Sequence, residues 1–138
     1  MKEQGGIAMK WFVWIARLLC LLAMPDFMIR CGRQFQRGNA KTIDPMYGYR
    51  TVMSMKNQDT WDFAHQVCGR LWWKVGWVML VLAVPAWAVS LWHCPYTQGM
   101  LCVWFVVPVA LEIAAYAATY GVVERALRKN FDKNGNRI

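Results

Sequence analysis

Apolar residues in this chain fall into three long blocks separated by polar stretches, and they do not recur at helix or strand spacing throughout. We place these blocks at about 7–29, 71–92 and 100–123. Each is about the ~20 residues that a helix needs to cross a ~30 Å hydrocarbon layer. Backbone groups in lipid must be hydrogen-bonded within the structure, so each block is expected to be helical. The pattern therefore predicts three transmembrane helices.

The second block is preceded by an amphipathic stretch, NQDTWDFAHQVCG (57–69), which Ser54 or Asn57 can cap. Its helical spacing places one set of residues on a single face: Trp61, Ala64, His65, Cys68 and Trp72. The opposite face is polar and carries Asp59, Asp62, Gln66 and Arg70. A helix that joins this stretch to the span would measure about 50 Å, longer than the hydrocarbon. Its first part is therefore expected to project into or lie along the interface.

Composition agrees with a membrane protein, because 57% of the 138 residues are hydrophobic, 17% are charged and nine are tryptophans. We predict an all-α, integral membrane bundle forming one domain over 1–138, with an interfacial amphipathic extension of the second helix. A cleaved signal peptide is the competing interpretation of the first block. Arg17 inside the apolar run and the lack of an A-x-A type cleavage site argue against it.

The formal net charge of +8 is concentrated at the edges of the apolar blocks. Lys and Arg populate the connector 30–70 and the tail 124–138, whereas the short loop between the second and third helices has none. The positive-inside rule then places the connector and the C-terminus in the cytosol and the N-terminus outside, as in a multi-pass membrane protein. The basic residues form no stripe along one helix, so direct nucleic-acid binding is not expected.

Two charged residues lie well inside the predicted spans, whereas Lys10, Asp26 and Lys74 lie nearer the ends of theirs. Glu112 is near the middle of the third helix, where a charge costs ~2.5 to 3.5 kcal/mol. Arg17 in the first helix is the natural partner, and we predict an Arg17–Glu112 contact. A protonated Glu112 hydrogen-bonded within the bundle is the first alternative, and proton or ligand handling is the second.

Candidate chemistry elsewhere is sparse. His65 is expected to be a hydrogen-bonded structural histidine, because Cys68 is the only potential metal ligand at suitable spacing on its face. The five cysteines show no metal spacing, although Cys94 and Cys102 could form a disulfide at the outer face. We recognise no catalytic motif and predict neither an enzyme nor a cofactor.

The connector contains YGYRT (47–51), where Arg50 carries a guanidinium that suits a lipid phosphate or a carboxylate. This segment fits either a plain interface anchor or a specific binding element. The run GYRTVMSMKNQDTWDFAHQVCGRLWW and the tail ERALRKNFDKNGNRI together resemble the SdpI-type bacterial membrane proteins. The founding member of that family is an immunity protein against a secreted peptide toxin. The founding protein is longer, so the chain resembles its second half.

The resemblance implies a protein of the bacterial plasma membrane that protects against a membrane-active toxin. For the founding member it also implies the retention of a transcriptional repressor at the membrane. The motif residues that it carries over are Gly48, Tyr49, Arg50, Thr51, Ser54, Trp61, Ala64, His65, Glu124, Phe131 and Asp132. Asp44 stands where the family usually has asparagine.

The partners expected from these features are membrane lipid, a secreted peptide toxin, a cytosolic repressor and a second copy of the chain. Two other classes of function stay open. One is a structural or assembly subunit packed through small residues of the third helix, namely Ala114, Ala115, Ala117, Ala118 and Gly121. The other is an intramembrane carrier or enzyme that uses Glu112 and His65.

Overall fold

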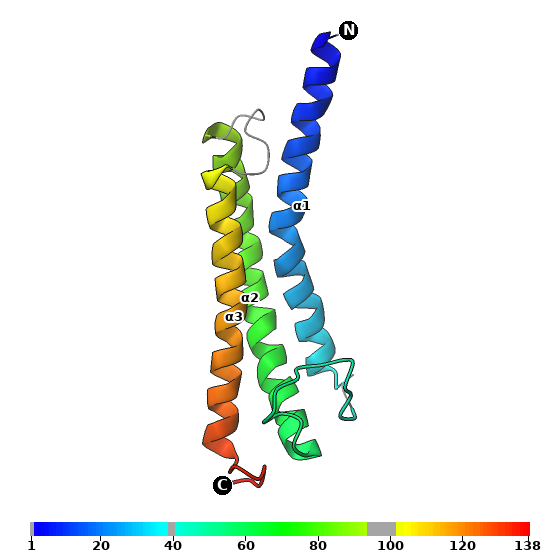
Figure 1. The fold of residues 1–138 in the computed structure, drawn as a ribbon, viewed down its shortest axis with the longest axis vertical. Helices are drawn as coiled ribbons and strands as arrows, with labels where there is room; N and C mark the ends of the chain where they lie inside the picture. The colour runs from blue at the N-terminus through cyan, green and yellow to red at the C-terminus, as the bar shows by residue number, and fades with distance from the viewer. Residues whose placement is uncertain (1, 39–40, 94–101) are drawn as a thin grey trace.

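The computed structural model describes residues 2–38, 41–93 and 102–138, which form three long helices (Figure 1). They are α1 (Lys2–Gln36), α2 (Gln58–His93) and α3 (Val103–Asn130). The helices run alternately up and down, so that the N-terminus lies at the opposite end of the bundle from the C-terminus. All three are long and apolar enough to cross a membrane. The predicted all-α membrane bundle is confirmed.

Each helix continues beyond its predicted apolar block. α2 joins the amphipathic stretch to the span without a break, and its 36 residues measure about 54 Å. α1 reaches Gln36 and α3 reaches Asn130, so the connector between the first two helices shortens to 37–57. The extra turns of α1 and α3 bury Phe35 and Leu127 against protein, which explains why the helices persist past the apolar segments. The three helices are continuous through Pro25, Pro85 and Pro108.

Glycines let α1 and α2 approach closely along their lower halves. A Cβ on Gly32 would lie 2.7 Å from the backbone nitrogen of Trp73, and a Cβ on Gly69 would lie 2.9 Å from the carbonyl oxygen of Gly32. A Cβ on Gly76 would lie 2.8 Å from the Ile29 side chain. The helices are therefore in backbone contact at positions where any larger residue would separate them.

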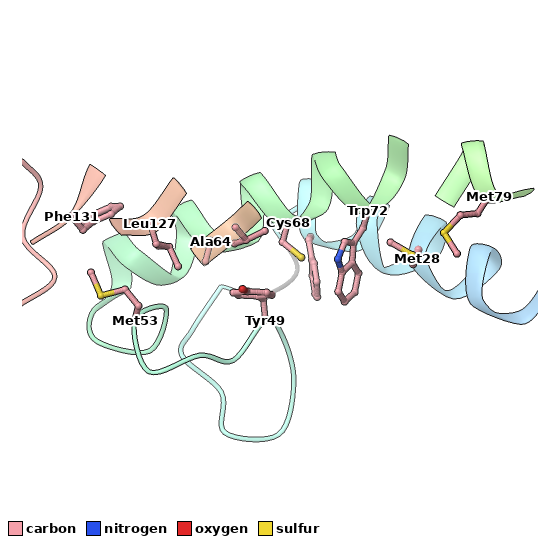
Figure 2. Close-up of a cluster of buried hydrophobic side chains, with 11 residues drawn as sticks. Met28, Tyr49, Met53, Ala64, Cys68, Trp72, Met79, Leu127 and Phe131 are labelled. Carbon is pink, nitrogen blue, oxygen red and sulfur yellow. The ribbon is translucent and has the colours of Figure 1, made fainter. Parts of the chain in front are cut away.

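The larger of two buried clusters lies at the end of the bundle that carries the connector (Figure 2). Its members are Met28, Phe35, Tyr49, Met53, Ala64, Cys68, Trp72, Met79, Val123, Leu127 and Phe131. A smaller cluster of Leu21, Ala83 and Phe105 lies towards the other end. Much of the densely packed interior is therefore at the connector end.

The predicted amphipathicity of the first part of α2 is confirmed. Its apolar face is buried throughout, at Trp61, Ala64, His65, Cys68 and Trp72. Its polar face is exposed, at Asp59, Asp62, Gln66 and Arg70. Protein covers the apolar face, because side chains of α1, the connector, α3 and the tail pack into the same cluster. Helical periodicity therefore identified the buried face correctly, and this face is covered by side chains from other segments of the chain.

Candidate functional site: the basal junction

The connector, the start of α2 and the C-terminal tail meet in one assembly at the lower end of the bundle (Figure 1). We call this assembly, made of residues 41–65 and 131–138, the basal junction. It contains most of the residues that the family motif singles out, and side-chain hydrogen bonds join its three segments. Figure 2 shows Tyr49 and Met53 of the connector directed towards α2 and α3.

His65 is the centre of the junction. The backbone N–H of Tyr49 donates to His65 Nε2 at 2.8 Å, and His65 Nδ1 is 2.8 Å from the carbonyl oxygen of Trp61. Because Nε2 accepts, the proton of the neutral ring must be on Nδ1, which then donates to Trp61. The ring also packs edge-on against Phe35, with centroids 4.8 Å apart. His65 is thus hydrogen-bonded, as expected, and its Nε2 contact joins the connector to α2.

Gly48 allows the connector to pass over this histidine. Its φ of +113° lies in a region that L side chains rarely adopt. A Cβ at this position would also overlap Nε2 of His65 and lie 2.9 Å from the ring of Trp61. Glycine is therefore required twice, once for backbone conformation and once for space.

Tyr49 ties the connector to α3. Its side chain is 1% exposed, its hydroxyl donates to the carbonyl oxygen of Tyr120 at 3.2 Å, and the two rings lie 5.1 Å apart. Burial, followed by the nearby Cys68 and Glu124, raises the pKa of the Tyr49 hydroxyl. The phenol therefore stays neutral and remains a donor at physiological pH.

Two reciprocal hydrogen-bond pairs shape the chain between Tyr49 and α2. Thr51 N–H donates to Ser54 Oγ at 2.8 Å, and Ser54 N–H donates to Thr51 Oγ1 at 3.1 Å. Ser54 Oγ also donates to the carbonyl oxygen of Tyr49 at 2.9 Å. Thr60 N–H donates to Asn57 Oδ1 at 2.9 Å, and Asn57 N–H donates to Thr60 Oγ1 at 3.1 Å. The second pair is a capping box, so Asn57 is the N-cap of α2.

The tail is folded back onto this cap. Asn57 Nδ2 donates to the carbonyl oxygen of Gly135 at 2.7 Å. The Asp132 carboxylate accepts the backbone N–H groups of Asn134 and Asn136, each at 2.8 Å. Hydrogen bonds, first from the backbone of Asn136, lower the pKa of Asp132. A closed turn therefore presents Gly135 to the start of α2.

Ten of the eleven predicted motif residues lie in the basal junction, and nine of these form its packed interior or its hydrogen-bonded turns. They are Gly48, Tyr49, Thr51, Ser54, Trp61, Ala64, His65, Phe131 and Asp132. Arg50 is exposed and donates to the carbonyl oxygen of Pro45. Glu124 lies on α3 beside Arg128, 3.3 Å from its Nε. Sequence reasoning missed Thr60, Gly135 and Phe35, although the N-x-x-T spacing of Asn57 and Thr60 is a readable capping signal.

The predicted Arg17–Glu112 contact is not found. Arg30–Asp26 and Arg128–Glu124 form ion pairs, and Glu112 takes part in neither. Arg17 is fully buried and has other interactions. Leu21 and Phe105 pack in one cluster, while Arg17 precedes Leu21 and Glu112 follows Phe105 on helices that run in the same direction. The offset is about 16 Å along the bundle, more than a side chain spans.

Glu112 and His65 also do not share a site. Glu112 lines a groove between α2 and α3 together with Met79, whereas His65 is in the basal junction. His65 and Met79 are separated by about 21 Å along α2 at 1.5 Å per residue. A carrier or enzyme that uses both groups together does not fit this geometry. The predicted Cys94–Cys102 disulfide lies outside the described residues, because Cys94 is in the segment 94–101.

Comparison with known proteins gives one match. A family model described as the SdpI/YfhL protein family matches residues 41–115, more than half of the chain. The matched range contains residues 41–57 of the connector, all of α2 and the part of α3 that carries Glu112. No curated protein and no solved structure matches.

Proposed function

Because the chain belongs to the SdpI/YfhL protein family, we propose that it protects a bacterial plasma membrane against a membrane-active peptide toxin. The observation that carries this proposal is the coincidence of the family match with the basal junction. The match covers residues 41–57 of the connector and the start of α2, and the motif residues there are held by specific hydrogen bonds. In our proposal the junction keeps three lipid-exposed helices in one fixed arrangement that binds the toxin within the membrane.

The proposed orientation places the basal junction in the cytosol. Lys and Arg are frequent in 30–74 and 124–138, which flank the lower ends of the helices. Exposed Trp73 and Trp77 on α2 suit the membrane interface above the junction. The start of α2 lies about 22 Å below Trp73, so in this orientation the junction extends beyond the headgroups into the cytosol.

We further propose that the cytosolic side relays toxin binding to a repressor protein. Val52 and Met46 of the connector are 88% and 86% exposed, and basic residues surround this end. Tyr49 and Tyr120 link the connector to α3 through a hydrogen bond and ring contact. A change in the position of α3 would therefore be transmitted directly to this exposed apolar surface.

Toxin challenge of a deletion strain tests the protective role. Cells that lack this protein are exposed to secreted peptides of toxin-producing neighbours, and the inhibitory dilution is measured with and without a plasmid copy. With the wild-type copy, we expect the peptide to stop inhibiting growth at a dilution at least about tenfold lower than without it. The Gly48→Ala copy should protect less when the same amount of protein is present in the membrane. Gly38→Ala, at a solvent-exposed glycine with open space around it, is the matched control. Equal sensitivity of deletion and wild-type cells to every such peptide would contradict the proposal.

A structural subunit is the second candidate, and one observation favours it. The small residues Ala114, Ala117, Ala118 and Gly121 are exposed on α3, and a Cβ on Gly121 would meet nothing within 4 Å. Such a face lets another membrane helix approach closely. Co-purification of one stoichiometric membrane partner, lost on Ala118→Leu, would support this role.

A further inference from the structure

A groove between α2 and α3 holds a single acidic residue among apolar side chains. The groove has a volume of about 360 Å³, and Glu112 is the only lining residue that is not apolar. Glu112 is 8% exposed, whereas Val78, Leu82 and Leu111 at the groove are more than half exposed. These residues lie in the middle of the spanning segments. The groove therefore opens towards the lipid chains.

Glu112 lacks a partner of its own within the described part of the chain. Over residues 2–38, 41–93 and 102–138 it forms neither a hydrogen bond nor an ion pair. A carboxyl group at this depth is costly unless it meets a cation or a hydrogen-bond partner. Its position in an open groove, more than nine-tenths buried, indicates that the missing partner is supplied by a ligand.

We propose that the groove binds an apolar, membrane-inserted peptide segment through one lysine side chain placed against Glu112. This inference rests on the proposed toxin-binding function and names the chemistry of its contact. The ammonium group is a cationic partner for the Glu112 carboxylate, and the aliphatic stem of lysine packs against the apolar walls of the groove. Small residues at the groove, Ala83, Ala86 and Ala115, leave room for a second helix.

The depth of Glu112 identifies a peptide as the source of the cation. Glu112 follows the start of α3 at Val103 by about 14 Å along the helix axis, which is near the middle of a ~30 Å hydrocarbon layer. Lipid amines stay in the headgroup layer and do not reach this depth. An apolar peptide helix carries its lysine into the hydrocarbon and can enter the groove sideways.

Energy transfer in vesicles tests this proposal with the full chain. The protein is reconstituted in phosphatidylcholine vesicles, and its tryptophans serve as donors to a dansyl group on a tryptophan-free Leu/Ala helix of about 20 residues. One peptide carries a central lysine and its control carries norleucine. We expect the wild-type protein to bind the lysine peptide about tenfold more tightly. Glu112→Gln should remove this preference, and Glu112→Asp should retain part of it.

Three outcomes would overturn the proposal. The first is equal binding of both peptides by the wild-type protein. The second is an unchanged preference for the lysine peptide in a Glu112→Gln variant whose elution and unfolding match those of the wild-type protein. The third is displacement of the lysine peptide by dodecylamine at equal concentration, which would indicate a small amphiphile. Ile113→Gln, which places the same amide on an exposed position outside the groove, should keep the preference. A deletion strain without a phenotype would remove the toxin role but leave this binding result intact.

Discussion

The backbone N–H of Tyr49 donates a 2.8 Å hydrogen bond to Nε2 of His65, a contact that closes the connector onto α2. The same ring donates from Nδ1 to the carbonyl oxygen of Trp61 one turn earlier. The histidine thus joins a loop to a helix through both of its nitrogens. Because a neutral ring carries one proton, the nitrogen that accepts one hydrogen bond requires the other nitrogen to donate. The stability of the basal junction should depend on this bridge.

Gly48→Ala should destabilise the junction more than Gly38→Ala. Both glycines have positive φ, so alanine is strained at each, by roughly 1 to 3 kcal/mol. Only at Gly48 does the added Cβ also meet His65 and Trp61. Thermal unfolding in detergent, followed by near-UV circular dichroism, compares the two variants. Equal losses would show that the close approach of Gly48 to His65 is not present.

His65→Leu should cost more stability than His65→Gln. Leucine leaves the buried Tyr49 N–H without an acceptor, which costs about 1 to 3 kcal/mol. The glutamine side-chain oxygen can reach the position of Nε2 and accept this hydrogen bond. The two variants are compared by the midpoint of thermal unfolding in one detergent. A leucine variant as stable as the parent would mean that the histidine does not hold the connector.

Gly69→Ala should separate α1 from α2. The added Cβ would lie 2.9 Å from both the Gly32 carbonyl oxygen and the Phe35 Cβ. Overpacking of this kind costs about 1 to 3 kcal/mol. Gly121→Ala is the matched control, because its helical glycine faces open space and alanine favours a helix by up to about 1 kcal/mol. Unfolding midpoints that fall for Gly121→Ala but not for Gly69→Ala would contradict the packing.

Acidification should release the tail turn. Hydrogen bonds, first from Asn136, lower the pKa of Asp132 below its ordinary value of 3.8. A lowered pKa in the folded state means that the ionised carboxyl stabilises the turn above pH 3.8, and that this contribution is lost as the pH falls through the folded value. The amide resonance of Asn136 should therefore stay in place down to about pH 4 and move below it. Asp132→Ala should show the released position at every pH.

Periodicity was sufficient to predict the helices and the buried face of α2, because helical spacing alone places Trp61, Ala64 and Cys68 together. It could not predict what covers that face. The covering contacts join residues far apart in the chain, such as Tyr49 with Tyr120 and Asn57 with Gly135. Long-range contacts of this kind leave no periodic signal in one sequence.

The Arg17–Glu112 prediction failed for a related reason. Residue counts give each group's depth along its own helix, but they give neither the relative shift of the helices nor which faces meet. In the structure α1 packs closely on α2 through Gly32, Gly69 and Gly76, while Glu112 faces a groove between α2 and α3. The close α1–α2 contacts depend on these three glycines, which the pattern of apolar blocks does not distinguish from other residues.

The protonation state and tautomer of the His65 ring show whether this residue holds the connector against α2. The chain has two histidines, so a ¹⁵N-histidine spectrum in detergent at neutral pH contains two rings, and His93→Gln assigns them. Our account predicts a neutral His65 with the proton on Nδ1 and an unprotonated Nε2 that accepts a hydrogen bond. A His65 ring with the proton on Nε2, or a charged ring, would be unable to accept the Tyr49 N–H and would contradict the account.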